Sequence, residues 1–117
     1  RFDCIDLWLP NLMYGDLDFI TFKQNMATLI LYHTPIKMEM NAASKFYDEN
    51  TLDMVFIDAD HSYEAVKNDI ATWLPKVKVG GMISGHDISH EPVKQAVIEA
   101  FGGASTIGNC WFVVKNA

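Results

Sequence analysis

The chain has 117 residues, half of them hydrophobic, with seven Gly and four Pro, a composition typical of one folded globular domain rather than a disordered or fibrous chain. With a formal net charge of -6, the chain lacks the excess of basic residues that binding to a nucleic-acid backbone requires. No apolar run approaches the ~18 residues of a membrane helix. We therefore expect a cytoplasmic protein that binds neither nucleic acid nor membranes.

The first third of the chain predicts a strand, a helix and a second strand. Apolar positions in residues 2–7 indicate a strand that follows Arg1 directly, so we expect the chain to be incomplete at its amino terminus. Residues 11–15 have loop chemistry, and residues 19–30 carry apolar side chains at helical spacing. Residues 36–40 then alternate apolar with charged, the pattern of a strand with one solvated face near the edge of a sheet.

The middle of the chain predicts a buried strand and a helix. Residues 52–57 form a short apolar run between acidic residues, which indicates a central strand covered on both faces. Ser62 can cap the following helix, which we expect to end at Pro75. Gly80 and Gly81 then predict a turn before the next strand, which contains Met82 and Ile83.

The end of the chain predicts a helix and a hairpin. Glu91 and Pro92 mark a helix start, and Gly102 with Gly103 ends that helix. Residues 105–114 have two apolar stretches with turn residues between them, as in a hairpin. The alternation of strands and helices predicts an α/β fold with a Rossmann-like, doubly wound and mainly parallel sheet. We expect residues 1–117 to form one partial domain that closes with an antiparallel hairpin.

Two pairs of residues have simple expected roles. Cys4 and Cys110 lie in apolar strand-like segments without the spacing of a redox pair or a zinc site, which predicts two buried free thiols. His33 and His90 have no neighbouring polar partners in the predicted fold, so we expect them on the surface.

Polar residues follow each predicted parallel strand. In open α/β sheets, ligands bind beyond the carboxyl ends of the strands. The third of these ends carries Asp58 and His61, and the fourth carries His86 and Asp87, so adjacent strands would bring these four side chains together. Such a group suits acid–base chemistry or metal binding. Alternatively, each residue caps a helix or bonds to backbone amides without a catalytic task.

The residues in segment 52–87 resemble a known family. The run Leu-Asp-Met-Val-Phe-Ile-Asp-Ala-Asp-His-Ser-Tyr-Glu at 52–64 is similar to the fourth-strand signature of class I S-adenosylmethionine-dependent methyltransferases. The helix, turn and Gly-His-Asp at 85–87 that follow resemble the small-molecule O-methyltransferase-like subgroup. The resemblance implies a sheet of order 3-2-1-4-5-7-6, of which this chain supplies strands two to seven. The first strand and its glycine-rich turn are absent.

The resemblance also implies roles for individual residues. Asp6 corresponds to the acidic residue that binds the ribose of S-adenosylmethionine. His61 or His86 would be the catalytic base for methylation of a small-molecule oxygen, with Asp58 in the catalytic site. A divalent cation such as magnesium would bind Asp58 and Asp87. Ile88 replaces the expected third ligand, so His61 or His86 would have to take that place. The full set of cofactor-binding residues expected from the strand ends is Asp6, Trp8, Ala42, Ser44 and Asp58.

Two other functions are compatible with the same residues. A metal-dependent hydrolase could use an Asp and His cluster around an activated water. Its expected ligands are Asp58, Asp60, His61, His86 and Asp87. A non-catalytic fragment is the second alternative, because a missing central strand leaves unpaired backbone groups that pairing with another copy would cover in a homodimer.

Overall fold

The computed structural model describes residues 2–9 and 17–117, so the loop expected at residues 11–15 lies outside the described residues. The chain divides into two compact units, Arg1–Ala43 and Ser44–Ala117, and each is described by itself. That residues 1–117 form one domain stays a prediction. Among the described helices, none is long and apolar enough to cross a membrane.

The first unit contains a two-stranded parallel sheet and one α-helix longer than a single turn. β1 (Phe2–Asp6) pairs with β2 (His33–Lys37), and α1 (Leu17–Asn25) lies between them in sequence. A 3-10 turn (Ala27–Leu29) follows α1, so the helix is shorter than expected. The short helix α2 (Met40–Ala43) closes the unit. β2 starts before the predicted strand and includes Pro35, which is tolerated because β2 lies at the edge of this sheet.

His33 is buried, which corrects the prediction of a surface position. It is 7% exposed, and its Nδ1 lies 2.8 Å from the carbonyl oxygen of Leu29. Its ring lies 6.3 Å from that of Phe2 and 5.9 Å from that of Phe22. The prediction rested on the lack of polar partners for His33, whereas β2 starts at His33 and carries the imidazole into the apolar part of the unit.

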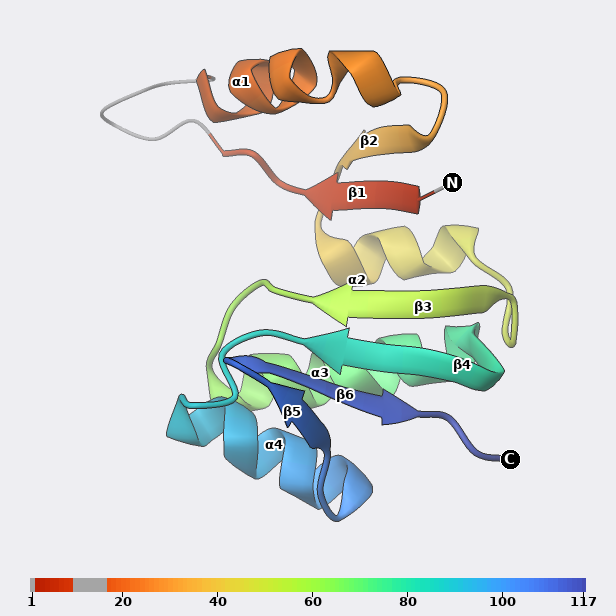
Figure 1. Ribbon diagram of the computed structural model, residues 1–117, viewed down its shortest axis with the longest axis vertical. Helices are drawn as coiled ribbons and strands as arrows, with labels where there is room; N and C mark the ends of the chain where they lie inside the picture. The colour runs from red at the N-terminus through yellow and green to blue at the C-terminus, as the bar shows by residue number, and fades with distance from the viewer. Residues whose placement is uncertain (1, 10–16) are drawn as a thin grey trace. The chain divides into compact units, whose positions relative to one another are not determined.

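The second unit is a four-stranded sheet with the order β3-β4-β6-β5. β3 (Leu52–Ile57) and β4 (Val77–Gly85) are parallel, and β6 (Cys110–Val114) is antiparallel to both β4 and β5 (Ser105–Ile107). In Figure 1 the arrows of β3 and β4 point the same way and that of β6 points back. In the expected arrangement, β1 and β2 are strands two and three, and β3 to β6 are strands four to seven. The orders of the two sheets therefore match its 3-2 and 4-5-7-6 parts, and the predicted terminal hairpin is present.

The helices of the second unit cover one face of its sheet. α3 (Tyr63–Trp73) continues into a 3-10 turn that contains Pro75, and α4 (Glu91–Phe101) ends at Gly102, whose φ of 74° suits glycine. α3 packs against β3 and α4, and Phe101 of α4 lies 6.1 Å from the ring of Trp111 in β6. The buried core residues of this unit are Ile57, Val66, Ile70, Trp73, Val77, Ile83, Val93, Ala96, Val97 and Trp111.

The opposite face of β3 is partly open, which corrects the prediction that both faces are covered. Met54 and Phe56 are 53% and 49% exposed, whereas Ile57 on the other face is buried. Within the described part of the chain, β3 pairs only with β4, so it forms an edge of this sheet rather than its centre. Association of two copies through this edge stays a prediction.

The expected turn at Gly80 and Gly81 is also wrong, because both residues lie inside β4. Gly80 has a φ of 83°, and the pairing of β3 with β4 shifts register between Leu52 and Met54. A Cβ on Gly81 would lie 2.8 Å from the carbonyl oxygen of Asp53. The glycines therefore allow an irregular, closely packed stretch of strand rather than a turn.

Candidate functional site

The end of β3 places Asp58 at the carboxyl edge of the sheet. Ile57 is the last strand residue and is buried, while the Asp58 side chain just beyond it is 55% exposed. The chain then passes through Asp60 and Ser62 into α3. A carboxylate in this position stays in contact with water while its backbone is fixed by the strand.

The end of β4 approaches β3 closely enough to require glycine. A Cβ on Gly85 would lie 2.6 Å from the carbonyl oxygen of Ile57 and 2.8 Å from two ring atoms of Trp111. The next backbone N–H, that of His86, donates to the same Ile57 oxygen at 3.1 Å. This close approach brings His86 beside Asp58, as the parallel pairing of the two strands predicts.

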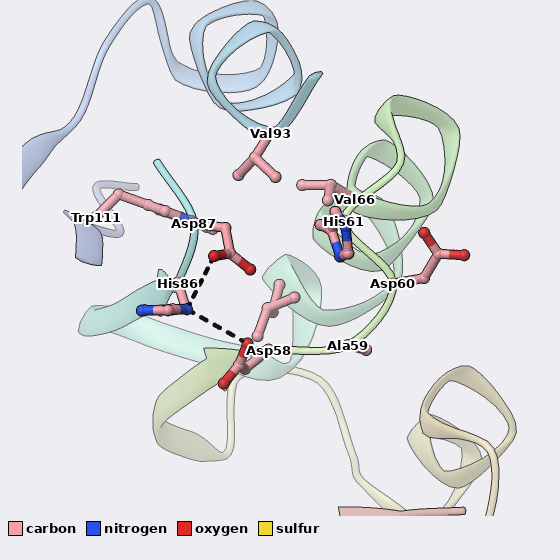
Figure 2. Close-up of a pocket in the computed structure, with 10 residues that line it drawn as sticks. Asp58, Ala59, Asp60, His61, Val66, His86, Asp87, Val93 and Trp111 are labelled. Atoms are coloured by element: carbon pink, nitrogen blue, oxygen red, sulfur yellow. Dashed lines mark ion pairs between the residues drawn. The ribbon is translucent and has the colours of Figure 1, made fainter. Parts of the chain in front are cut away.

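Asp58, His86 and Asp87 form the centre of the site, as Figure 2 shows. The Nδ1 atom of His86 lies 3.7 Å from Asp58 Oδ1 and 3.2 Å from Asp87 Oδ1. All three side chains are partly exposed, with fractions of 40%, 55% and 34% for His86, Asp58 and Asp87. One ligand atom from each lies within 4.8 Å of the other two, a spacing that a single cation could bridge.

Asp60 and His61 do not join this group. The carboxylate of Asp60 accepts the Ser62 backbone N–H at 2.7 Å, and hydrogen bonds from the Ser62 backbone and hydroxyl lower the pKa of Asp60. Ser62 is the N-cap residue of α3, as predicted, but its hydroxyl makes no hydrogen bond to the helix. The backbone N–H of Ser62 is the group that Asp60 binds. In Figure 2, Asp60 points away from the other carboxylates. The ring of His61 instead packs edge-on against that of His90, 4.9 Å away.

The five ligands expected for a hydrolase therefore do not converge on one point. Three of them come within reach of one ion, beside a hollow of about 10 Å³, which is at the lower limit for one water molecule. Asp60 and His61 line the same hollow, and its remaining lining residues are apolar. The apolar residues of the lining are Ile57, Ala59, Val66, Val93 and Trp111.

Asp6 and Trp8 lie at the end of β1 in the first unit. The Oδ1 atom of Asp6 accepts the backbone N–H of Trp8 at 2.7 Å, while the Asp6 side chain is exposed. Trp8 has a φ of 40°, and its ring packs 4.7 Å and 4.8 Å from the rings of Phe19 and Phe22. Asp6 therefore presents a carboxylate at a strand end, whereas the contacts of Trp8 are those of a packing residue.

The predicted cofactor residues after β2 lie in and beside α2. Glu39 caps this helix, because its two carboxylate oxygens accept the backbone N–H groups of Asn41 at 2.9 Å and Ala42 at 2.7 Å. Ser44 is 7% exposed. Sequence reasoning missed Glu39, although an acidic residue just before a helix is a recognisable capping signal.

The two cysteines are free and only half buried, which corrects the prediction of full burial. They lie in β1 and β6, and most residues of both strands are partly or fully exposed. Burial of the Cys4 thiol, together with the nearby charge of Asp3, raises its pKa above the ordinary value. Neither cysteine is among the residues that meet at the His86 ion pairs.

Comparison with known proteins identifies the family. Residues 3–88 match a protein family described as Methyltransferase domain. The chain belongs to this methyltransferase-domain family. The match includes Asp6, Asp58, His86 and Asp87, so the strand ends described above lie inside the shared domain. No curated protein matches the chain.

A solved structure supports the fold of this methyltransferase domain. A crystal structure of a protein from Corynebacterium glutamicum superposes with a TM-score of 0.69 at 14% sequence identity. The similarity covers 98% of this chain and 60% of that protein, so the chain spans only part of the neighbour's length. Both the resemblance to class I methyltransferases and the Rossmann-like α/β fold expected from the sequence are confirmed.

Proposed function

We propose that this domain transfers a methyl group from S-adenosylmethionine to an oxygen of a small molecule. The observation that carries the proposal is the meeting of Asp58, His86 and Asp87 at the carboxyl ends of β3 and β4. Ligands bind at this edge of open α/β sheets, and the residues lie within the part of the chain that matches a methyltransferase domain.

The chemistry needs a base and a site for the methyl donor. S-adenosylmethionine supplies an electrophilic methyl group bonded to a positively charged sulfur. His86 is the first candidate base: its neutral imidazole accepts the proton of an acceptor hydroxyl as the new carbon–oxygen bond forms and the carbon–sulfur bond breaks. The positive charge that His86 gains lies beside two carboxylates. His61, which lines the same hollow, is the second candidate.

In the first unit, Asp6 is the main residue proposed to bind the methyl donor. The exposed carboxylate of Asp6 suits the ribose hydroxyls, because an ionised carboxylate only accepts hydrogen bonds and each hydroxyl can donate one. Ala42 and Ser44, which follow β2, and Asp58, which follows β3, are the other residues that the family resemblance implies. Trp8 is the weakest member, because its ring already packs on Phe19 and Phe22.

A divalent cation is proposed between Asp58, His86 and Asp87. Two carboxylates and one imidazole form a mixed oxygen and nitrogen donor set, and the three ligand atoms are close enough to share one ion. Magnesium strongly favours oxygen ligands, whereas manganese and zinc also accept imidazole. The donor set thus fits a divalent cation, and manganese better than the magnesium expected from the sequence. A bound cation would orient the acceptor oxygen, and because His86 would then be a ligand of the cation, His61 would be the base.

The test is calorimetry of S-adenosylmethionine binding to the natural full-length protein. We expect Asp6→Ala to weaken binding at least tenfold. Asp53→Ala, at the opposite end of β3 from Asp58, is the matched control and should bind as the wild type does. Absence of binding in the wild-type protein would exclude the methyltransferase proposal. Titration with manganese, monitored in the wild type and in Asp58→Ala, tests the cation separately.

A further inference from the structure

We infer that Asn109 is a positioning residue that holds Asp87 beside His86. The inference rests on the proposed function only in giving Asp87 a role in the site. Asn109 lies in the turn between β5 and β6, twenty-two positions after Asp87 in sequence, where Ile107 pairs with Cys110 across the hairpin. It is outside the segment that matches the methyltransferase family, which ends at residue 88.

The backbone of Asp87 adopts a conformation that needs support. Its φ is 65°, in the left-handed region that residues other than glycine rarely occupy. The Asp87 carbonyl accepts the His90 N–H at 2.9 Å, which closes a tight turn after β4. Such a conformation persists only where surrounding contacts fix it, and it commonly marks a functional position.

Asn109 makes the contacts that fix this turn from outside. Its backbone carbonyl accepts the N–H of Ile88 at 3.1 Å, and its side-chain oxygen accepts the N–H of Ser89 at 2.9 Å. Its amide nitrogen lies 3.5 Å from Asp87 Oδ1, at the long limit of a hydrogen bond. The hydrogen bonds from the Ile88 and Ser89 N–H groups therefore hold the turn, and the contact with Asp87 Oδ1 orients the carboxylate.

The position of the turn determines the geometry of the site. Asp87 Oδ1 is the same atom that lies 3.2 Å from His86 Nδ1. If the turn relaxes to an ordinary right-handed backbone, the carboxylate leaves this place. The hairpin thus contributes to the site through Asn109, although no residue of the hairpin is needed to contact the reacting atoms.

The experiment compares Asn109→Ala and Asn109→Asp with the wild type by nuclear magnetic resonance. Asn109→Ala removes the acceptor for the Ser89 N–H, so we expect exchange of that amide with solvent to increase at least tenfold. The imidazole resonances of His86 should move toward those of an Asp87→Asn reference variant. Asn109→Asp keeps an acceptor oxygen and should retain the protection of Ser89.

Asn50→Ala is the matched control. Asn50 also has a left-handed backbone, with φ of 56°, and its side-chain oxygen accepts a hydrogen bond from Lys115 at 3.0 Å. It precedes β3, at the end of that strand opposite Asp58. A general loss of stability would affect both variants, whereas we expect the His86 resonances to move only in Asn109→Ala.

Unchanged exchange of Ser89, or unchanged His86 resonances, in a folded Asn109→Ala protein would overturn the inference. These readouts need neither the methyl donor nor a cation, so they remain decisive if the proposed function is wrong. If manganese binds the wild type, its affinity should fall about tenfold in Asn109→Ala, the effect usual for loss of a group that orients a ligand. An equal affinity in the two proteins would also contradict the role of Asn109.

Discussion

Replacing Gly85 with Ala tests whether the close approach of β3 and β4 is a requirement of the fold. The new Cβ would lie 2.6 Å from the Ile57 carbonyl oxygen and 2.8 Å from two ring atoms of Trp111. Favourable contacts between heavy atoms begin at about 3.5 Å, so each neighbour would have to move by close to 1 Å. Trp111 is 1% exposed and the oxygen belongs to a paired strand, so neither moves freely.

The expected cost follows from these contacts. Overpacking a dense core typically costs about 1–3 kcal/mol, and simultaneous clashes with backbone and a buried ring place Gly85→Ala near about 3 kcal/mol. At roughly 4 °C per kcal/mol, the conversion for a domain of about 100 residues, such a loss would lower the melting temperature by about 12 °C. Urea unfolding followed by circular dichroism measures the free energy, and a thermal scan measures the shift.

Gly102→Ala is the control for this prediction. Gly102 has a φ of 74°, and a Cβ added there would meet no atom within 4 Å, so its replacement costs only backbone strain of about 1 kcal/mol. If Gly85→Ala is no more destabilising than Gly102→Ala, the steric reasoning is refuted. A double variant with Trp111→Phe should relieve part of the clash but not the contact with Ile57.

Three further predictions concern single side chains. Because the pKa of Asp60 is lowered below 3.8, its ionised form contributes stability that is lost as the pH falls through that pKa. In urea unfolding, Asp60→Asn should therefore lose less stability than the wild type as the pH falls below 3.8. Because the pKa of Cys4 is raised above 9.0, alkylation of Cys4 in a Cys110→Ser background should be slow at neutral pH and accelerate only above pH 9.0. His33→Ala should cost about 1–3 kcal/mol, because it removes a buried ring that lies against Phe2 and Phe22, while the Leu29 carbonyl keeps the Tyr32 N–H as a donor; a change below about 0.5 kcal/mol would contradict this.

Features that depend on local sequence were predicted well. The six residues of β3 were predicted to the residue, because an apolar run between acidic residues has few other structures available. The start of α4 at Glu91 and its end before Gly102 follow from Pro92 and a left-handed glycine, both of which act locally. The meeting of Asp58 with His86 and Asp87 needed one further step, the pairing of adjacent parallel strands.

Features that depend on contacts across the fold were missed. Gly80 and Gly81 were interpreted as a turn, because sequence does not show that a neighbouring carbonyl leaves no room for a side chain within the strand. The burial of His33 depends on aromatic residues that are brought around it by α1 and β1. Asn109 had no signal beyond a hairpin turn, since its partners lie in another loop.

The two strand ends of the site are linked by a short chain of contacts. Gly85 lets β4 approach β3, and the His86 N–H then bonds to Ile57, whose next residue is Asp58. A shift of the β4 end would therefore change the distance from His86 to Asp58 as well as the stability of the sheet. The turn after β4 is fixed separately, by Asn109. Gly85→Ala should thus alter the contact of His86 with Asp58, whereas Asn109→Ala should alter its contact with Asp87, and the His86 resonances can distinguish the two effects.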